Sequence, residues 1–308
     1  MTGARAVDIA LCQYIRPMKN RKSPAGPPHF DLSLDVECSF GSRAASSACG
    51  ELFLNRYDAA DILDLLEDAG LTAHLRGKGF SGVAVDIDRD DAGIHHLRMY
   101  GDYIDRKNLL VTIRISEAPY TLDRAALTGA RGTVPLQLFV LEWLQSGNPR
   151  EQFGEHDIPL PGQMIPGLGA VPYLMELLRR FGVMERRDGI MDTPAHLHGA
   201  IMYSRRFLFV DPVHEGILQA LKRDLGSYGM CDMSWAMATG AIIETNSEQQ
   251  QKFNPSPQIY PLSPASGKYF FSWRYRRRVR DIMKRKKFIL NEQEMIRKRN
   301  ELLRKRQQ

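Results

Sequence analysis

The sequence contains only four cysteines in 308 residues, and none has the spacing of a metal-binding or redox motif. They are Cys12, Cys38, Cys49 and Cys231, and no two of them form a CxxC pair. Zinc sites and disulfide frameworks need closely spaced or numerous cysteines, so the sequence indicates neither, and we expect no metal cofactor. We interpret the cysteines as reduced thiols, which are typical of a cytoplasmic protein.

Long apolar runs are also missing. No stretch reaches about 18 apolar residues, so the sequence predicts no transmembrane segment. The N-terminus has too short an apolar stretch, and the wrong order of charges, for a secretory signal. With 43% hydrophobic and 25% charged residues, the composition is that of a soluble globular protein.

The charges are unevenly distributed along the chain. Residues 268–308 hold 16 Lys and Arg against 4 Asp and Glu, whereas residues 1–267 hold 26 basic and 32 acidic residues. The net charge of +6 therefore comes from the C-terminal segment alone. Such a segment suits nucleic acid, an anionic membrane surface or an acidic protein partner. The simpler alternative is a solvated charged helix that docks on the acidic body of its own chain.

Composition divides the chain into four parts: an N-terminal segment 1–28, a main domain 29–226, an irregular, partly proline-rich extension 227–267 and a basic helical tail 268–308. Alternating apolar residues in the main domain predict strands at 30–40, 51–57, 82–88, 95–100 and 109–116, and helical spacing predicts a helix at 58–70. Residues 135–144 are apolar on both faces. They fit a central strand, although periodicity alone does not exclude a short helix.

A loop with three prolines and three glycines, Leu160 to Pro172, runs directly into an amphipathic helix predicted at 170–181. Glycines before a helix N-terminus let backbone amides converge, and the helix end carries a partial positive charge that favours phosphate. The amides available for this are those of Gly167, Leu168, Gly169, Ala170 and Val171. The alternative is a plain connection whose helix start is shaped by Pro172.

Over residues 135–210 the predicted order is strand, loop, helix, strand, helix, strand, which is typical of an α/β fold. This order, with its Gly-x-Gly loop and the later "GAIMY" helix, resembles the acetyl-coenzyme A-binding half of the GCN5-related N-acetyltransferase (GNAT) family. In that family an Arg/Gln-x-x-Gly-x-Gly/Ala loop holds the coenzyme A pyrophosphate, and the later helix carries an Asn and a Tyr. Gly167, Gly169 and Tyr203 match, His196 stands where the family often has Asn, and Met164 replaces the Arg or Gln.

The resemblance implies a mixed, mostly antiparallel sheet flanked by helices. It also implies acyl transfer from acetyl-coenzyme A, or another acyl-coenzyme A, to an amine of a protein or small molecule. Tyr203 is then the expected general acid, because a phenol pKa near 10 is close to that of a thiol. Glu142 is the expected general base, and His196 joins the loop amides in binding the cofactor. The structural alternatives are a Tyr203 that packs its helix on the sheet and a solvent-facing Glu142.

Other chemistries fit the sequence less well. "GLGAVP" lacks the third small residue and the following acidic residue of a dinucleotide fingerprint, and no Walker lysine or Gly-x-Ser-x-Gly elbow occurs. His196 and His198, two apart on a predicted helix, should point in different directions, which argues against a metal site. The second hypothesis is a non-catalytic GNAT-like binding protein that uses residues 268–308 to engage nucleic acid or an acidic protein.

Overall fold

The computed structural model describes residues 51–127 and 131–306. The predicted N-terminal segment 1–28 and the strand predicted at 30–40 lie outside these residues. The strand predicted at 51–57 is instead a turn, in which only Phe53 and Tyr57 form a β-bridge. Leu54 and Asn55 have φ angles of 54° and 59°, and left-handed backbone of this kind reverses the chain where a strand would extend it.

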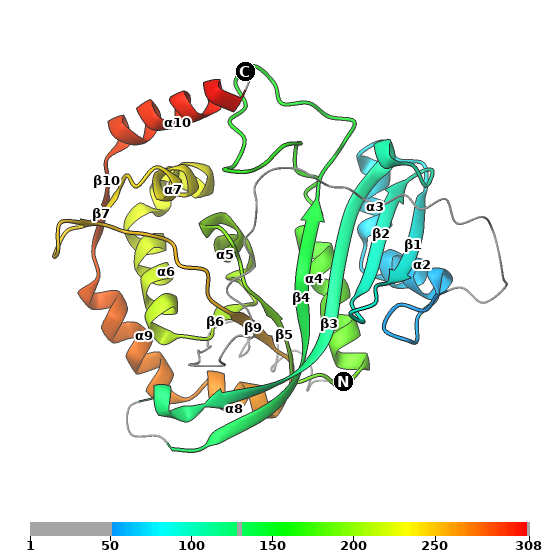
Figure 1. The fold of residues 1–308 in the computed structure, drawn as a ribbon, viewed down its shortest axis with the longest axis horizontal. Coiled ribbons are helices and arrows are strands. Elements are labelled where there is room, and N and C mark those ends of the chain that lie inside the picture. Colours follow the sequence, from blue (N-terminus) through cyan, green and yellow to red (C-terminus); the bar gives the residue numbers. More distant parts are fainter. Residues whose placement is uncertain (1–50, 128–130, 307–308) are drawn as a thin grey trace.

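A seven-stranded sheet crosses the molecule in the order β1-β2-β3-β4-β5-β9-β6 (Figure 1). Its strands are β1 (Val83–Arg89), β2 (His95–Gly101), β3 (Leu109–Asp123), β4 (Thr133–Ser146), β5 (Gly189–Asp192), β6 (Leu208–Phe209) and β9 (Gln258–Pro261). β4 and β5 run parallel, and every other neighbouring pair of this sheet is antiparallel. The predicted mixed, mostly antiparallel sheet is confirmed, and residues 135–144 belong to a strand.

The helices α2 (Ala59–Asp68), α3 (Leu71–Gly77) and α4 (Val171–Met184) share one hydrophobic core with β1 to β4. α4 forms because its apolar residues recur at helical spacing and Pro172 is tolerated in its first turn. The predicted inner stripe is fully buried in this core: Leu174, Leu177, Leu178 and Phe181. The helix that follows the glycine loop, and the face that it buries, are therefore those that the sequence predicts.

A second core lies beyond β5, among α5 (Leu197–Tyr203), α6 (Pro212–Leu225) and α7 (Gly229–Ala238). A small sheet borders it, with β7 (Ile242–Glu244) between β8 (Gln249–Gln250) and β10 (Phe288–Leu290). The segment 227–267 is thus not irregular throughout, since it contains α7, β7, β8 and β9. Because β9 belongs to the main sheet, that sheet extends past the predicted boundary at Gly226.

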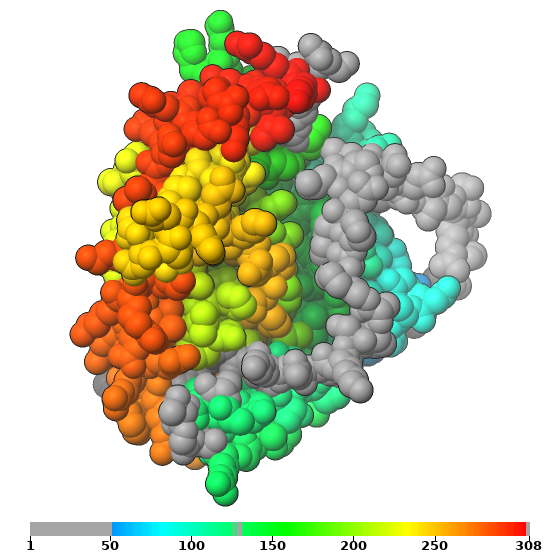
Figure 2. All heavy atoms as spheres, turned by 60° about the vertical axis from the view of Figure 1, so that its left-hand side comes forward, coloured from blue at the N-terminus to red at the C-terminus, as the bar shows by residue number. Residues whose placement is uncertain are grey.

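The basic segment contains the end of α8 (Pro264–Phe270), then α9 (Trp273–Arg285), the strand β10 and α10 (Glu292–Arg306). It is also docked on the body. Gly216 of α6 lies so close to α9 that an added Cβ would stand 2.6 Å from the Cβ of Ile282. The Arg223 guanidinium donates to the carbonyls of Met283 and Lys286 at 2.5 and 2.7 Å. α9 and α10 form the outer surface of this side of the molecule (Figure 2).

Short 3₁₀ turns lie at Arg106–Asn108, Arg124–Ala126 and Gly226–Tyr228. Among the described residues, no helix has both the length and the apolar character needed to cross a bilayer.

Candidate active site

The parallel ladder between β4 and β5 ends part-way along β4. Leu141 pairs with Asp192, the last residue of β5, whereas β4 continues to Ser146 beside β3. Beyond this pair β5 has ended and only β4 continues (Figure 1). α4 follows β4 and α5 follows β5, and the two strands are parallel, so both helices begin on the side of the sheet to which the carboxyl ends of these strands point.

A β-bulge lies at the same point. Arg114 of β3 pairs with Trp143, and the next residue, Ile115, pairs with Leu141. Glu142 is the extra residue and has no direct counterpart on β3. Bulges leave a residue outside the regular ladder and are frequent beside active sites. The last β4 residue paired with β5, Leu141, and the bulged residue, Glu142, are therefore adjacent.

The glycine loop is fixed by contacts on both sides. The Nε2 atom of His74 lies 2.9 Å from the carbonyl oxygen of Leu168, which can only accept, so Nε2 donates. Gly147 leaves room for Ile165, whose side chain an added Cβ would meet at 2.4 Å. Gly169 has a φ of 73°, a conformation that glycine adopts without strain. The loop is therefore an ordered element whose shape depends on glycine.

The backbone amides at the end of this loop form no hydrogen bonds among the described residues. Within the part of the chain that the structure describes, none of the N–H groups from Gly167 to Val171 forms a hydrogen bond with the protein. The helix begins at Ala170, whose carbonyl accepts from Tyr173 and Leu174, and this N-cap residue has no side-chain acceptor. Of the five residues whose amides are predicted to bind phosphate, Gly167 and Gly169 are exposed and Val171 is half-buried, whereas Leu168 and Ala170 are fully buried. The accessible part of the loop, beside the positive end of α4, is therefore its two glycines.

Tyr203 ends α5 and is 8% exposed. Its ring packs on Phe207, with 5.5 Å between centroids, and belongs to the same core as Leu168 and Ala170 of the loop. Burial raises the pKa of Tyr203 above its usual range, and the charge of Asp192 raises it further. The phenol keeps its proton at neutral pH, but it is a weaker acid than the unperturbed phenol assumed from the sequence.

Asp192 is a residue of this site to which sequence reasoning gave no catalytic role. Its Oδ2 atom is inaccessible to solvent and has no hydrogen-bond partner among the described residues. Burial raises the pKa of Asp192 to about 7, and the amide of Thr193 opposes this rise by hydrogen bonding. Ile190, two residues earlier on β5, lies in the same core as Tyr203, so Asp192 faces the same side of the sheet as Tyr203. The sequence does hold one signal for Asp192, because it is a carboxylate at the end of an otherwise apolar strand.

Glu142 lies at the bulge, but its side chain is exposed. Its Oε1 atom accepts a hydrogen bond of 2.7 Å from the Ser116 hydroxyl. Ser116 follows Ile115, a residue of the core that contains Tyr203, so Ser116 faces the opposite side of the sheet. The structure therefore brings the backbone of Glu142 to the end of the ladder but does not place its carboxylate beside Tyr203.

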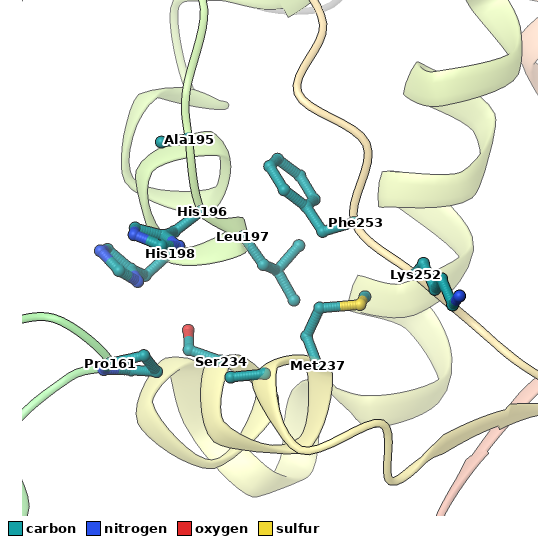
Figure 3. Close-up of a pocket in the computed structure, with 10 residues that line it drawn as sticks. Pro161, Ala195, His196, Leu197, His198, Ser234, Met237, Lys252 and Phe253 are labelled. Carbon is teal, nitrogen blue, oxygen red and sulfur yellow. The ribbon is translucent and has the colours of Figure 1, made fainter. Parts of the chain in front are cut away.

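His196 and His198 line a cavity of about 260 Å³ between α5, α7 and the chain before β9. Leu197, Met237 and Phe253 point toward one another there, while the two imidazoles lie side by side (Figure 3). His196 is the N-cap of α5 and has an extended backbone, so the divergence expected for a helical pair was wrong. Burial lowers both pKa values, that of His198 to about 4.

Among the described residues, no group of three or more His, Cys, Asp or Glu side chains is arranged to hold a metal ion. Cys231 is a free thiol on α7, and burial raises its pKa.

No protein-family model, curated protein or solved structure matches this chain.

Proposed function

We propose that the chain is an acyl-coenzyme A-dependent N-acyltransferase, which transfers an acetyl or other acyl group to an amine. The observation that carries this proposal is the end of β5 beside a β4 that continues, together with a glycine loop whose amides from Gly167 to Val171 have no acceptor among the described residues. In the GNAT family, which the sequence resembles, the pantetheine arm occupies the slot between two splayed strands. The seven-strand order and the single parallel pair are compatible with that reading.

The loop supplies the anion-binding part of the site. Among the described residues, the amides of Gly167 to Val171 have no protein acceptor, and α4 adds the partial positive charge of its N-terminus. A diphosphate has several acceptor oxygens and fits such a set of donors. Met164 stands where the family has Arg or Gln, so the backbone supplies most of the binding in this proposal.

The bulge and Tyr203 supply the chemistry. A backbone amide at Glu142, outside the regular ladder, can donate to the thioester carbonyl and stabilise the negative charge that develops on it. Tyr203 donates a hydrogen bond to the sulfur as the carbon–sulfur bond breaks. Its raised pKa means that the phenol holds its proton until a thiolate forms beside it.

Calorimetry with acetyl-coenzyme A tests this proposal, and S-acetylpantetheine is the matched ligand, since it has the thioester but no diphosphate. We expect acetyl-coenzyme A to bind at least about tenfold more tightly, because several charge-assisted hydrogen bonds are lost with the diphosphate. Absence of heat at millimolar acetyl-coenzyme A would contradict the proposal. Equal affinity for the two ligands would contradict the role of the loop.

The exposed face of α9 favours a second candidate function, a GNAT-like protein that binds a polyanion without catalysis. Arg274, Arg277, Arg280 and Lys284 are exposed, and Trp273 is 62% exposed with the Arg274 guanidinium 5.6 Å from its ring centroid. Arginines interleaved with an exposed aromatic ring are typical of surfaces that contact nucleic acid or another acidic partner.

Fluorescence anisotropy with a labelled single-stranded oligonucleotide tests the second candidate. Binding should weaken linearly on a log–log plot against salt, and R277Q/R280Q/K284Q should reduce the slope by about two to three. A polyglutamate peptide serves as the acidic protein-like probe. If neither probe binds at low salt, or if the triple variant binds like the wild type, this second function is wrong.

A further inference from the structure

Two polar side chains with unpaired buried atoms lie at opposite positions on the strands β5 and β9. Asp192 pairs in register with Gln258, and directly opposite residues of an antiparallel pair point to the same side. Gln258 is fully buried, and neither its Oε1 nor its Nε2 atom has a hydrogen-bond partner among the described residues. The Oδ2 atom of Asp192 is also buried without a hydrogen-bond partner among the described residues.

Three such atoms at one position are unusual. Most buried side-chain polar atoms in native proteins are paired, and each unpaired one costs roughly 1–3 kcal/mol. An ordered water or a ligand is therefore the expected partner. The location favours a ligand, because Asp192 ends the β5 ladder and its charge reaches the phenol of Tyr203.

In its ionised form Asp192 lacks a cationic partner among the described residues. Within the described part of the chain, no lysine, arginine or histidine forms an ion pair with Asp192, and only burial and the amide of Thr193 shift its pKa. An ammonium group would supply both the charge and the N–H donors that this carboxylate lacks.

The missing partner of Gln258 is different. Its carboxamide offers one acceptor and two donors, so a ligand that satisfies it needs an N–H group and an acceptor oxygen close together. A carboxylate oxygen would be repelled by Asp192, which leaves a neutral hydroxyl or carbonyl oxygen. An amine with an adjacent hydroxyl meets both requirements.

We propose that Asp192 and Gln258 bind the acceptor substrate, a small primary amine that carries a neutral oxygen next to its amino group, such as an amino alcohol or amino sugar. This inference rests on the proposed acyltransferase function and names its substrate class. Asp192, in place of Glu142, is then the catalytic residue that takes the proton of the ammonium.

The transfer step balances with these groups. Asp192 Oδ2 takes one proton from the ammonium, and the nitrogen lone pair of the resulting amine attacks the thioester carbonyl carbon. The carbon–nitrogen bond forms and the carbon–sulfur bond breaks, with its electron pair on sulfur. Tyr203 gives its phenol proton to the sulfur and takes the second proton from the nitrogen. The products are the amide and the free thiol. Asp192 releases the first proton to solvent.

The matched probes are ethanolamine and propylamine, which have the same number of heavy atoms and differ by a hydroxyl in place of a methyl group. Calorimetry on the full chain should show ethanolamine binding about tenfold more tightly, as expected for buried polar partners left unpaired by the methyl group. Asp192→Asn should weaken both amines at least about tenfold, since it removes the charge. Gln258→Leu should abolish the preference for ethanolamine.

Glu117→Gln, which removes an exposed carboxylate of β3, is the control and should bind both amines as the wild type does. Equal affinity of the wild type for both amines, or no binding of either, would overturn the inference and leave an ordered water as the partner. Unchanged amine binding by Asp192→Asn would overturn it as well. If Asp192→Asn does not fold, the comparison of the two amines on the wild type still decides.

Acetyl-coenzyme A is titrated separately, so the two proposals fail independently. Coenzyme A binding without amine binding would reject only the acceptor site. Amine binding without coenzyme A binding would reject the acyltransferase function and keep the amine site.

Discussion

The imidazole rings of His196 and His198 are stacked, with 5.2 Å between their centroids and 22° between their planes. This contact exists because His196 stands just outside α5 while His198 lies within its first turn. Both rings are removed from water, and the Nδ1 atom of His198 is buried without a partner among the described residues. Burial lowers the pKa of both rings, and the neighbouring His196 lowers that of His198 further.

His198 makes stability depend on pH in a definite direction. Its folded pKa, about 4, lies below the unfolded value near 6.5, so below pH 6.5 the unfolded chain binds a proton that the native state does not. We expect this group to remove about 2 kcal/mol of stability between pH 7.5 and pH 5. His198→Gln should reduce the pH dependence by that amount in denaturant unfolding. An identical pH dependence in variant and wild type would contradict the burial of this ring.

Asp192 gives the stability of the protein the opposite pH dependence. Its folded pKa of about 7 lies above the unfolded value of 3.8, so its contribution is present at low pH and is lost as pH rises through 7. Between pH 5 and pH 8 the wild type should lose about 2.5 kcal/mol from this group. Asp192→Asn, which does not titrate, should lack this loss and gain relative stability at pH 8. Parallel stability curves for the two proteins would show that Asp192 is not buried.

Gly167 and Gly169 differ in backbone conformation, and stability measurements on alanine variants can detect this difference. Gly169 has a φ of 73°, whereas an added Cβ at Gly167 would meet only the Gln163 amide nitrogen, at 3.8 Å. Gly169→Ala should destabilise by about 1 kcal/mol, and Gly167→Ala should leave stability nearly unchanged. Thermal or urea unfolding measures both. Equal effects of the two substitutions would contradict the loop conformation described above.

Docking of the basic segment depends on the absence of a side chain at Gly216. An added Cβ would lie 2.6 Å from Ile282 and 3.0 Å from the backbone oxygen of Val279. Gly216→Ala should therefore destabilise by about 1–2 kcal/mol, because overpacking outweighs the better helix propensity of alanine. Gly226→Ala is the matched control, since nothing lies within 4 Å of its added Cβ. A more stable Gly216→Ala protein would show that α9 is not packed on α6.

The sequence predicted the elements whose patterns are long and regular. The amphipathic stripe of α4 and the apolar residues of β4 repeat over several turns or pleats, so local periodicity is sufficient to recognise them. The segment 227–267 lacked such a signal. α7 is apolar on most of its faces, and β9 is a four-residue strand ending in proline, so neither has a period that separates it from a loop.

Local sequence patterns predicted only part of the candidate site. The loop from Gly167 to Val171 is contiguous and is identified by its glycines. The pairing of Asp192 with Gln258 is a matter of register between strands that are far apart in the sequence, and no local pattern encodes it. The orientation of Glu142 depended on a bulge, which the alternation of apolar residues in β4 does not reveal.

The position of β9 has a consequence for the order in which the chain is assembled during synthesis. β6 reaches the main sheet only through β9, and β9 begins at Gln258, after α6, α7 and the small sheet strands β7 and β8 have been made. Until then β5 is an open edge, and Asp192 has no Gln258 opposite it. Most of the described chain is therefore synthesised before β9 can cover β5, and a nascent chain stopped before residue 258 would expose that edge to other chains.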